Sequence, residues 1–240
     1  MRPSRGLKLG DVQIDLIRNL HLRSKTNKIA RFSVALVTCA SVGLIPAWQA
    51  TASETIPEPI SLYKFDETTG ATTVADSFRG ASGLGTLYGS PTFQTGQVGN
   101  AMCLNGTNQY ATAPIIGGGL KEFTISAWAK LDARQQWSTV VKNWADPDVG
   151  NFHLGLDASN GYWSNYIGRT ISPSSLVGVN SQTLGAAPLN QWQYLVTTVS
   201  ESAGEIKLYV DGALVESKSF TGTIARYGNL MSNPLRYPMP

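Results

Sequence analysis

Histidine and cysteine are scarce in this sequence, which limits the chemistry that it can perform. Its 240 residues include two histidines and two cysteines. His21 and Cys39 lie within residues 1–52, which we expect to be removed as a leader, so that His153 and Cys103 remain alone. A single histidine cannot form a His-rich zinc site, and a single cysteine has no partner for an internal disulfide bond. We therefore expect both to be structural residues of the folded domain.

Local catalytic motifs are absent as well. The sequence contains no G-x-S-x-G motif of the kind that presents a nucleophilic serine. Retaining glycoside hydrolysis requires two carboxyl groups about 5–5.5 Å apart. Glu201 and Glu205 are separated by a Ser-Ala-Gly turn, which is typical of a solvated loop rather than of such a pair. These absences favour a protein that is not an enzyme.

Charge is distributed unevenly along the chain. Residues 1–52 contain eight Lys and Arg and two Asp, a net charge of +6, whereas the remainder contains 11 basic and 14 acidic residues, a net charge of −3. The basic charge therefore lies in the expected leader and the working domain is mildly acidic. A basic surface for nucleic acid is excluded by this distribution.

A hydrophobic segment near the N-terminus has the three parts of a secretory signal peptide. Phe32–Ile45 is an uncharged run of 14 residues, with three basic residues just before it and the small-residue sequence Ala-Thr-Ala at 50–52. A 14-residue helix spans about 21 Å at 1.5 Å per residue, which is short of the roughly 30 Å hydrocarbon core of a bilayer. We expect cleavage after Ala52 and a secreted or cell-surface product.

The segment that precedes this hydrophobic run is unusually long for a signal peptide. Residues 7–22 carry enough apolar positions to predict a short amphipathic helix. An extended signal peptide, a start codon assigned too early and an uncleaved membrane anchor all remain open. In each case, contact with a membrane is expected only through the N-terminal segment.

After a linker at residues 53–59, short β-prone runs alternate with turn residues, and no helical period is sustained. In the run FTISAWAKL, every second residue from Phe123 to Leu131 falls on one apolar face. Asp211-Gly212 predicts a two-residue hairpin. The candidate strands are 60–65, 101–104, 110–113, 123–131, 139–142, 152–157, 193–199, 205–210 and 214–220. This pattern predicts an all-β fold, a two-sheet antiparallel β-sandwich or jelly roll.

Five motifs in order resemble a known family. They are LYKFDETTGATTVADS, GNAMCLNGTNQYATAP, FTISAWAKLD, NQWQYLVTTVS and IKLYVDGALV. The sequence is similar over roughly residues 60–230 to the LamG-like jelly rolls, the laminin G and pentraxin group of concanavalin A-like sandwiches. This resemblance implies a jelly-roll domain over residues 60–240 and places the chain among proteins that are often exported.

The sequence departs from that family in two respects. Related glucanases carry E-x-D-x-x-E on one strand, and no such run occurs here. The family also continues into a closing strand, whereas this sequence ends at Pro240 without one. We therefore expect the closing strand to be missing and an unpaired sheet edge to be exposed.

Aromatic and amide side chains suggest sugar binding, because flat aromatic faces stack on sugar rings while amides bond the hydroxyl groups. A strand that carries Tyr162, Ser164 and Tyr166 on one side would send Trp163 to the other. Trp128 is expected under a loop or in a groove, and Trp192 in the core. The predicted ligand-binding residues are Trp137, Trp144, Tyr162, Trp163, Tyr166 and Asn165.

The resemblance also implies a calcium ion on the rim of the sandwich in some members. Asp66 and Asp76 lie in turn-like stretches that match the acidic loops of the family, and they are the candidate ligands. The alternative is that each is a solvated turn aspartate. Asp146 and Asp148 form another acidic loop, which fails the spacing of an EF-hand.

Taken together, these features predict an exported, non-catalytic carbohydrate-binding or adhesion module that binds a glycan or a cell-surface protein. A purely structural or protein-interaction module and a remnant of a glycoside hydrolase are the alternatives.

Overall fold

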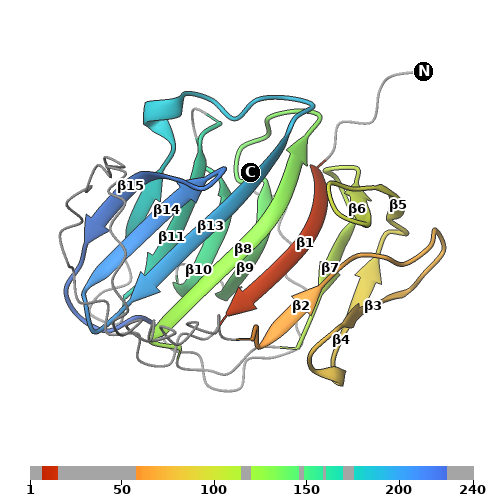
Figure 1. The fold of residues 1–240 in the computed structure, drawn as a ribbon, viewed down its shortest axis with the longest axis horizontal. Helices are drawn as coiled ribbons and strands as arrows, with labels where there is room; N and C mark the ends of the chain where they lie inside the picture. Colours follow the sequence, from red (N-terminus) through yellow and green to blue (C-terminus); the bar gives the residue numbers. More distant parts are fainter. Residues whose placement is uncertain are drawn as a thin grey trace, which may run out of the picture.

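A computed structural model describes residues 7–15, 58–114, 120–145, 149–158, 161–169 and 176–225, with the backbone alone described at 7–15, 144–145 and 149–150. These residues form an 11-stranded and a 4-stranded β-sheet, whose strands pair in antiparallel fashion (Figure 1). The predicted all-β sandwich is thereby confirmed. The hydrophobic leader segment and its cleavage site lie outside the described residues.

The strands of the two sheets have the following bounds. The large sheet contains β1 (Leu7–Asp15), β2 (Ser61–Tyr63), β3 (Thr73–Asp76), β4 (Gly80–Tyr88), β5 (Thr92–Thr95), β6 (Asn100–Leu104), β7 (Tyr110–Thr112), β8 (Glu122–Leu131), β13 (Trp192–Ser200), β14 (Glu205–Val210) and β15 (Ala213–Ser219). The small sheet contains β9 (Thr139–Ala145), β10 (Val149–Leu156), β11 (Trp163–Gly168) and β12 (Leu176–Asn180). A 3-10 turn, η1 (Gln182–Leu184), follows β12.

Alternation along β8 produces one face of the core. Phe123, Ile125, Ala127, Ala129 and Leu131 are all fully buried, whereas the residues at Thr124, Trp128 and Lys130 are half-buried on the other face. The apolar face predicted for this strand is therefore confirmed. β14 repeats the pattern, with every second residue from Ile206 to Val210 buried.

The core lies between the two sheets. Leu154 and Leu156 of β10 and Ile167 of β11 are fully buried in the same hydrophobic cluster as the β8 residues. The rings of Phe123 and Phe152 lie 5.7 Å apart and join one sheet to the other. This contact between the sheets requires an alternation of inner and outer residues on every strand that takes part.

The hairpin between β14 and β15 is also as predicted. Asp211 and Gly212 have φ values of 51° and 83°. Positive φ at both central residues is the requirement of a type I′ turn.

The N-terminal strand corrects one expectation. Residues 7–15 form β1 rather than the start of a helix over 7–22, and residues 16–22 lie outside the described residues. β1 pairs with β8 on one side and with β2 and β6 on the other. A bulge between Leu9 and Val12 interrupts the alternation of apolar residues, and it therefore imitates helical spacing in the sequence.

Among the described residues, no helix is long and apolar enough to cross a membrane.

Replacing Leu208 with Ala should lower the free energy of unfolding by about 2–5 kcal/mol, because it leaves a cavity between the sheets. Leu208 is fully buried on β14, whereas Leu214 on the neighbouring β15 is 52% exposed. Leu214→Ala is thus the matched control and should change stability by no more than about 0.5 kcal/mol. Urea denaturation of both variants measures the difference, and equal losses would contradict the assignment of the inner face.

Candidate functional site

The outer face of the small sheet carries a group of aromatic side chains. Because Leu154 and Ile167 point into the core, the neighbouring positions His153 and Tyr166 lie on the opposite face. These two residues are direct partners in the pairing of β10 with β11. Their rings lie 6.5 Å apart.

Trp137 adds a third ring from the loop between β8 and β9. Its centroid lies 5.8 Å from the His153 ring and 5.9 Å from the Tyr166 ring. The Trp137 backbone has a φ of 59° and donates a hydrogen bond to the carbonyl oxygen of Asp157 at 3.4 Å. A positive φ is uncommon for a bulky residue and costs free energy. We call Trp137, His153 and Tyr166 the small-sheet cluster.

Two glycines allow the small-sheet cluster to lie directly on the sheet. A Cβ atom at Gly155 would lie 2.2 Å from the carbonyl oxygen of Ser138, in the loop that carries Trp137. A Cβ atom at Gly178 of β12 would lie 2.3 Å from two ring carbons of Tyr166. Only glycine permits both close approaches.

His153 is the most buried member of the cluster and is only 7% exposed. Its Nε2 atom is 3.1 Å from the hydroxyl oxygen of Thr139, and that hydroxyl donates a hydrogen bond to the carbonyl oxygen of Trp137 at 3.2 Å. With the Thr139 hydroxyl proton engaged in this way, the tautomer that completes the network carries its proton on Nε2, which donates to the Thr139 oxygen. The Nδ1 atom is therefore left with a lone pair, and it has no hydrogen-bond partner among the described residues.

The surroundings of His153 keep the imidazole ring neutral. Burial disfavours the charged form, and the positive charge of Lys142 disfavours it further, so that the pKa of His153 falls from 6.5 to about 4. At neutral pH the small-sheet cluster therefore combines two half-buried aromatic rings with one buried, unpartnered ring nitrogen. Such a site can hold a ring that has apolar faces and hydroxyl groups at its edge.

The structure brings together some of the predicted ligand-binding residues and separates others. Trp137 and Tyr166 belong to the small-sheet cluster. Tyr162 immediately precedes β11, is half-buried, and donates its backbone N–H to the carboxylate of Asp157 at 3.2 Å. The side chain of Trp144 lies outside the described residues.

Trp163 and Asn165 are corrections, because both lie on the inner face of β11. Trp163 is 2% exposed and donates its indole N–H to the side-chain oxygen of Gln193 at 2.6 Å. Asn165 is fully buried and pairs with Leu154 and Val179 on the adjacent strands. The alternation had placed Trp163 opposite Tyr166 correctly, but the sequence did not show which of the two faces the core.

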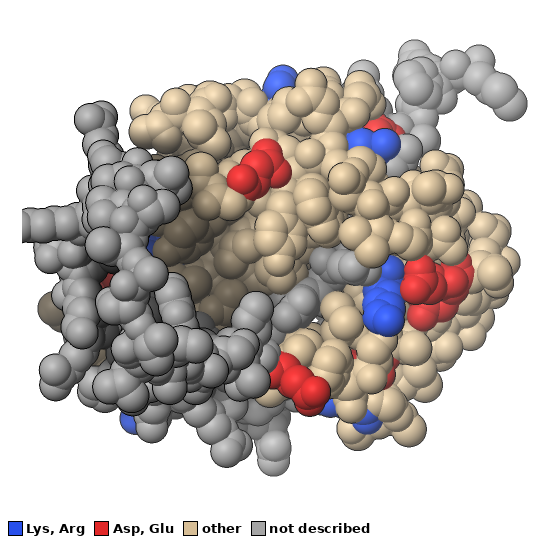
Figure 2. Space-filling model, viewed as in Figure 1, with Lys and Arg blue, Asp and Glu red and all other residues tan. Residues whose placement is uncertain are grey.

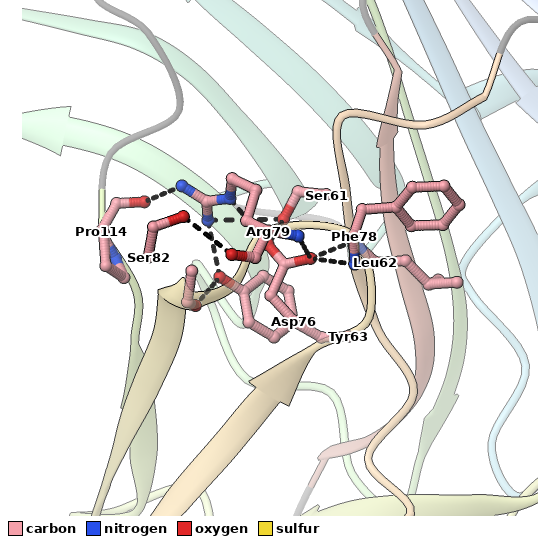
Figure 3. Close-up of polar contacts among 9 residues, drawn as sticks. Ser61, Leu62, Tyr63, Asp76, Phe78, Arg79, Ser82 and Pro114 are labelled. Carbon is pink, nitrogen blue, oxygen red and sulfur yellow. Dashed lines mark hydrogen bonds and ion pairs between the residues drawn. The ribbon is translucent and has the colours of Figure 1, made fainter.

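Asp76 is a further correction, because its carboxylate is already saturated by protein donors (Figure 3). It accepts hydrogen bonds from the Ser61 hydroxyl at 2.5 Å and from the Arg79 guanidinium at 2.7 Å. The backbone N–H groups of Leu62, Phe78 and Arg79 donate to its other oxygen. Burial by itself would raise the pKa of Asp76, but these hydrogen bonds outweigh it and hold the pKa well below its usual range.

A calcium ion would have to displace these donors from Asp76, and we assign this carboxylate to the structure of the domain. Asp66, the other candidate ligand, is exposed and accepts the backbone N–H of Asn100 at 3.0 Å. The residues that the structure describes include no group of three or more His, Cys, Asp and Glu that could hold a metal ion.

A second aromatic group lies on the outer face of the large sheet. Trp128 and Tyr194 pair across β8 and β13 with ring centroids 5.1 Å apart. The ammonium group of Lys130 lies 5.3 Å from the ring centre of Trp192, which is half-buried here rather than in the core as expected. Figure 2 shows this side of the molecule, with a hollow in the region of β8 and β13 whose visible floor is formed mainly by uncharged residues.

Two functional candidates were thus missed in the sequence. His153 was expected to be a structural residue, because an isolated histidine between apolar residues has no local signal of a role. Tyr194 was not considered, since its neighbour Trp128 comes from a strand more than 60 positions earlier in the chain. Both residues become candidates only through the register of strand pairing, which sets His153 opposite Tyr166 and Tyr194 opposite Trp128.

The free energy of unfolding should fall as the pH is lowered from about 6.5 to 4. Unfolded His153 takes up a proton near pH 6.5, whereas the folded protein binds it only near pH 4, so protonation favours the unfolded chain in this window. The loss should approach about 3 kcal/mol at the acidic end. Urea denaturation of His153→Gln at several pH values should show a free energy of unfolding that depends less steeply on pH. An unchanged pH dependence of the free energy of unfolding would mean that His153 is not buried in its neutral form.

Asn165→Leu should raise the free energy of unfolding by about 1–3 kcal/mol, because both polar atoms of the buried amide lack a hydrogen-bond partner among the described residues. Thermal and urea denaturation measure this gain. Asn151→Leu is the matched control and should be destabilising, since its amide nitrogen donates to the carbonyl oxygen of Ala225 at 2.9 Å. A loss of stability in Asn165→Leu would show that this amide is satisfied.

Comparison with family models agrees with this architecture. No curated protein matches the chain. Among solved structures, domain 4 of AbnA, a GH43 extracellular arabinanase from Geobacillus stearothermophilus, in complex with arabinotriose, is 23% identical over 63% of this chain and 75% of that chain, with a TM-score of 0.47. Residues 105–233, more than half of the 240, match the family described as the concanavalin A-like lectin/glucanases superfamily. The resemblance inferred from the five motifs is thereby confirmed, and the chain belongs to this superfamily.

Proposed function

We propose that this chain is a non-catalytic carbohydrate-binding module that holds a sugar ring on the small-sheet cluster. One observation carries the proposal. The buried Nδ1 atom of His153 has no partner among the described residues, and the His153 ring lies 5.8 Å from the Trp137 ring and 6.5 Å from the Tyr166 ring. A buried polar atom without a partner costs about 1–3 kcal/mol, and a ligand that donates a hydrogen bond recovers that cost.

Sugar chemistry fits these groups. The C–H faces of a pyranose or furanose ring are apolar and stack on aromatic side chains, while its hydroxyl groups donate hydrogen bonds. Tyr166 stays un-ionised at neutral pH, because burial and the negative charge of Asp157 raise the pKa of its hydroxyl. The small-sheet cluster therefore combines two flat faces with a neutral acceptor.

Binding rather than turnover is favoured by the protonation state of His153. A general base works best when its pKa is close to the working pH, and the pKa of His153 is about 4. Asp76 cannot take this role, since Arg79 holds its carboxylate in an ion pair at 2.7 Å.

A second candidate function is adhesion through the hollow on the outer face of the large sheet. The tilted pair of Trp128 and Tyr194 and the Lys130–Trp192 contact supply aromatic side chains on the outer face of β8 and β13. Aromatic residues are enriched in protein interfaces. For both candidate functions, export of the module to the cell surface is a further proposal, which rests on the leader sequence.

Trp137→Ala, Tyr166→Ala and His153→Leu should each weaken glycan binding by at least about 10-fold, or 1.4 kcal/mol. An array of neutral oligosaccharides that includes arabinotriose selects the probe sugar, and titration calorimetry then measures its affinity. Trp128→Ala is the matched control, because it removes a half-buried tryptophan from the other sheet. It should leave the affinity unchanged.

Loss of sugar binding in Trp128→Ala together with normal binding in Trp137→Ala would show that the sugar binds to the large sheet instead. Failure to bind any sugar on the array would contradict the proposed function. Release of a shortened sugar during the incubation would show that the chain is an enzyme.

A further inference from the structure

β1 connects the other strands of the large sheet to one another. Within the described part of the chain, β15, β14, β13 and β8 lie on one side of it, while β2, β3, β4 and β7 follow on the other, and β6 with β5 also joins through β1 (Figure 1). Without β1, the large sheet would separate between β8 and the strands β2 and β6. The connections among these three groups of strands therefore depend on residues 7–15.

We propose that the gap between β8 and the pair β2 and β6 is a strand-acceptor site, and that residues 7–15 occupy it as a separable part of the folded domain. This inference goes beyond carbohydrate binding and does not depend on it. The partner that the site accepts is an extended segment, antiparallel to β8, with apolar residues at alternating positions.

The walls of the acceptor site explain this preference. Leu7, Leu9, Val12 and Ile14 pair with Leu131, Ala129, Ala127 and Ile125 of β8, all of which are fully buried. On the other side, Val12 and Ile14 pair with Tyr63 and Ser61 of β2, and Leu9 pairs with Met102 of β6. These three partners are also buried. An empty site would expose apolar residues and leave backbone N–H and carbonyl groups unpaired on both walls.

The intervening positions are polar and show that the present occupant is not the tightest possible one. Gln13 pairs with Ser126, and Lys8 pairs with Lys130. Like charges at directly opposed positions of antiparallel strands are destabilising. A segment with an acidic residue opposite Lys130 is expected to bind more tightly than residues 7–15 do.

This arrangement has a consequence for the leader. β1 precedes the hydrophobic run Phe32–Ile45, whereas the rest of the sheet follows it. A cut after Ala52 would turn residues 7–15 into a separate peptide that is held only by strand pairing. Export that leaves this peptide behind would empty the acceptor site for a segment of another chain.

Hydrogen exchange on the intact full-length protein tests the occupancy. The amides of residues 7–15 should exchange on the order of 100-fold more slowly than in an unstructured peptide. Gln13→Pro should abolish that protection, since proline cannot donate within a strand that is paired on both sides. Gln13→Thr is the matched control that keeps the N–H and should remain protected. Unprotected amides at residues 7–15 in the unmodified protein would overturn the proposal.

A charge variant tests the register independently of any loss of folding. Lys8→Glu sets an acidic residue opposite Lys130 and should raise the melting temperature by about 2 °C. Lys25→Glu makes the same change of net charge outside β1 and should not raise it. An equal effect of the two variants would contradict the pairing of Lys8 with Lys130.

A protease site inserted after Ala52 tests separability. After cleavage of the full-length protein, fragment 1–52 should remain bound during gel filtration. If the fragment dissociates while the remainder keeps its melting temperature, the acceptor site is not needed and the proposal fails. If it dissociates and the remainder loses stability, a synthetic peptide of residues 5–17 should restore the melting temperature, and failure to restore it would equally refute the proposal.

Discussion

The packing of the two inner faces against each other is the constraint on which the other features of this domain depend. Side chains on a strand alternate between faces. Burial of Leu154, Leu156 and Ile167 against the large sheet therefore decides that His153 and Tyr166 face outward. The same rule sends Trp163 inward, although it is the larger and more obvious candidate for stacking on a sugar. The candidate site is therefore formed by side chains that the packing of the core leaves on the outer face of the small sheet.

Polar groups inside this framework fall into two kinds. Asp76 is surrounded by donors from Ser61, Arg79 and the backbone, and its charge is compensated where it lies. His153 is buried to a similar degree, yet one ring nitrogen lacks a partner among the described residues. A saturated group stabilises the local structure, whereas an unsaturated one leaves a free-energy cost that a ligand can recover. This difference is why we assign structure to the first and binding to the second.

Regular alternation decided how well each strand could be predicted. β8, β10, β13 and β14 were expected close to their observed bounds, because apolar residues recur at every second position. β4 was missed since its glycines leave little pattern, and β1 was mistaken for a helix because a bulge shifts its apolar residues. β11 carries aromatic or amide side chains on both faces, so that neither its inner face nor the burial of Asn165 could be recognised.

The amino-acid sequence alone determined the all-β class, the Asp211–Gly212 hairpin and the superfamily, because these depend on local period, turn residues and the order of motifs. Only the tertiary structure decided that Trp137, His153 and Tyr166 lie together, that Arg79 rather than a metal ion neutralises Asp76, and that residues 7–15 fill the gap beside β8. Each of these depends on which strands are neighbours and in which register. A shift of one residue exchanges the two faces of a strand, and local sequence does not specify pairing between segments that are far apart in the chain.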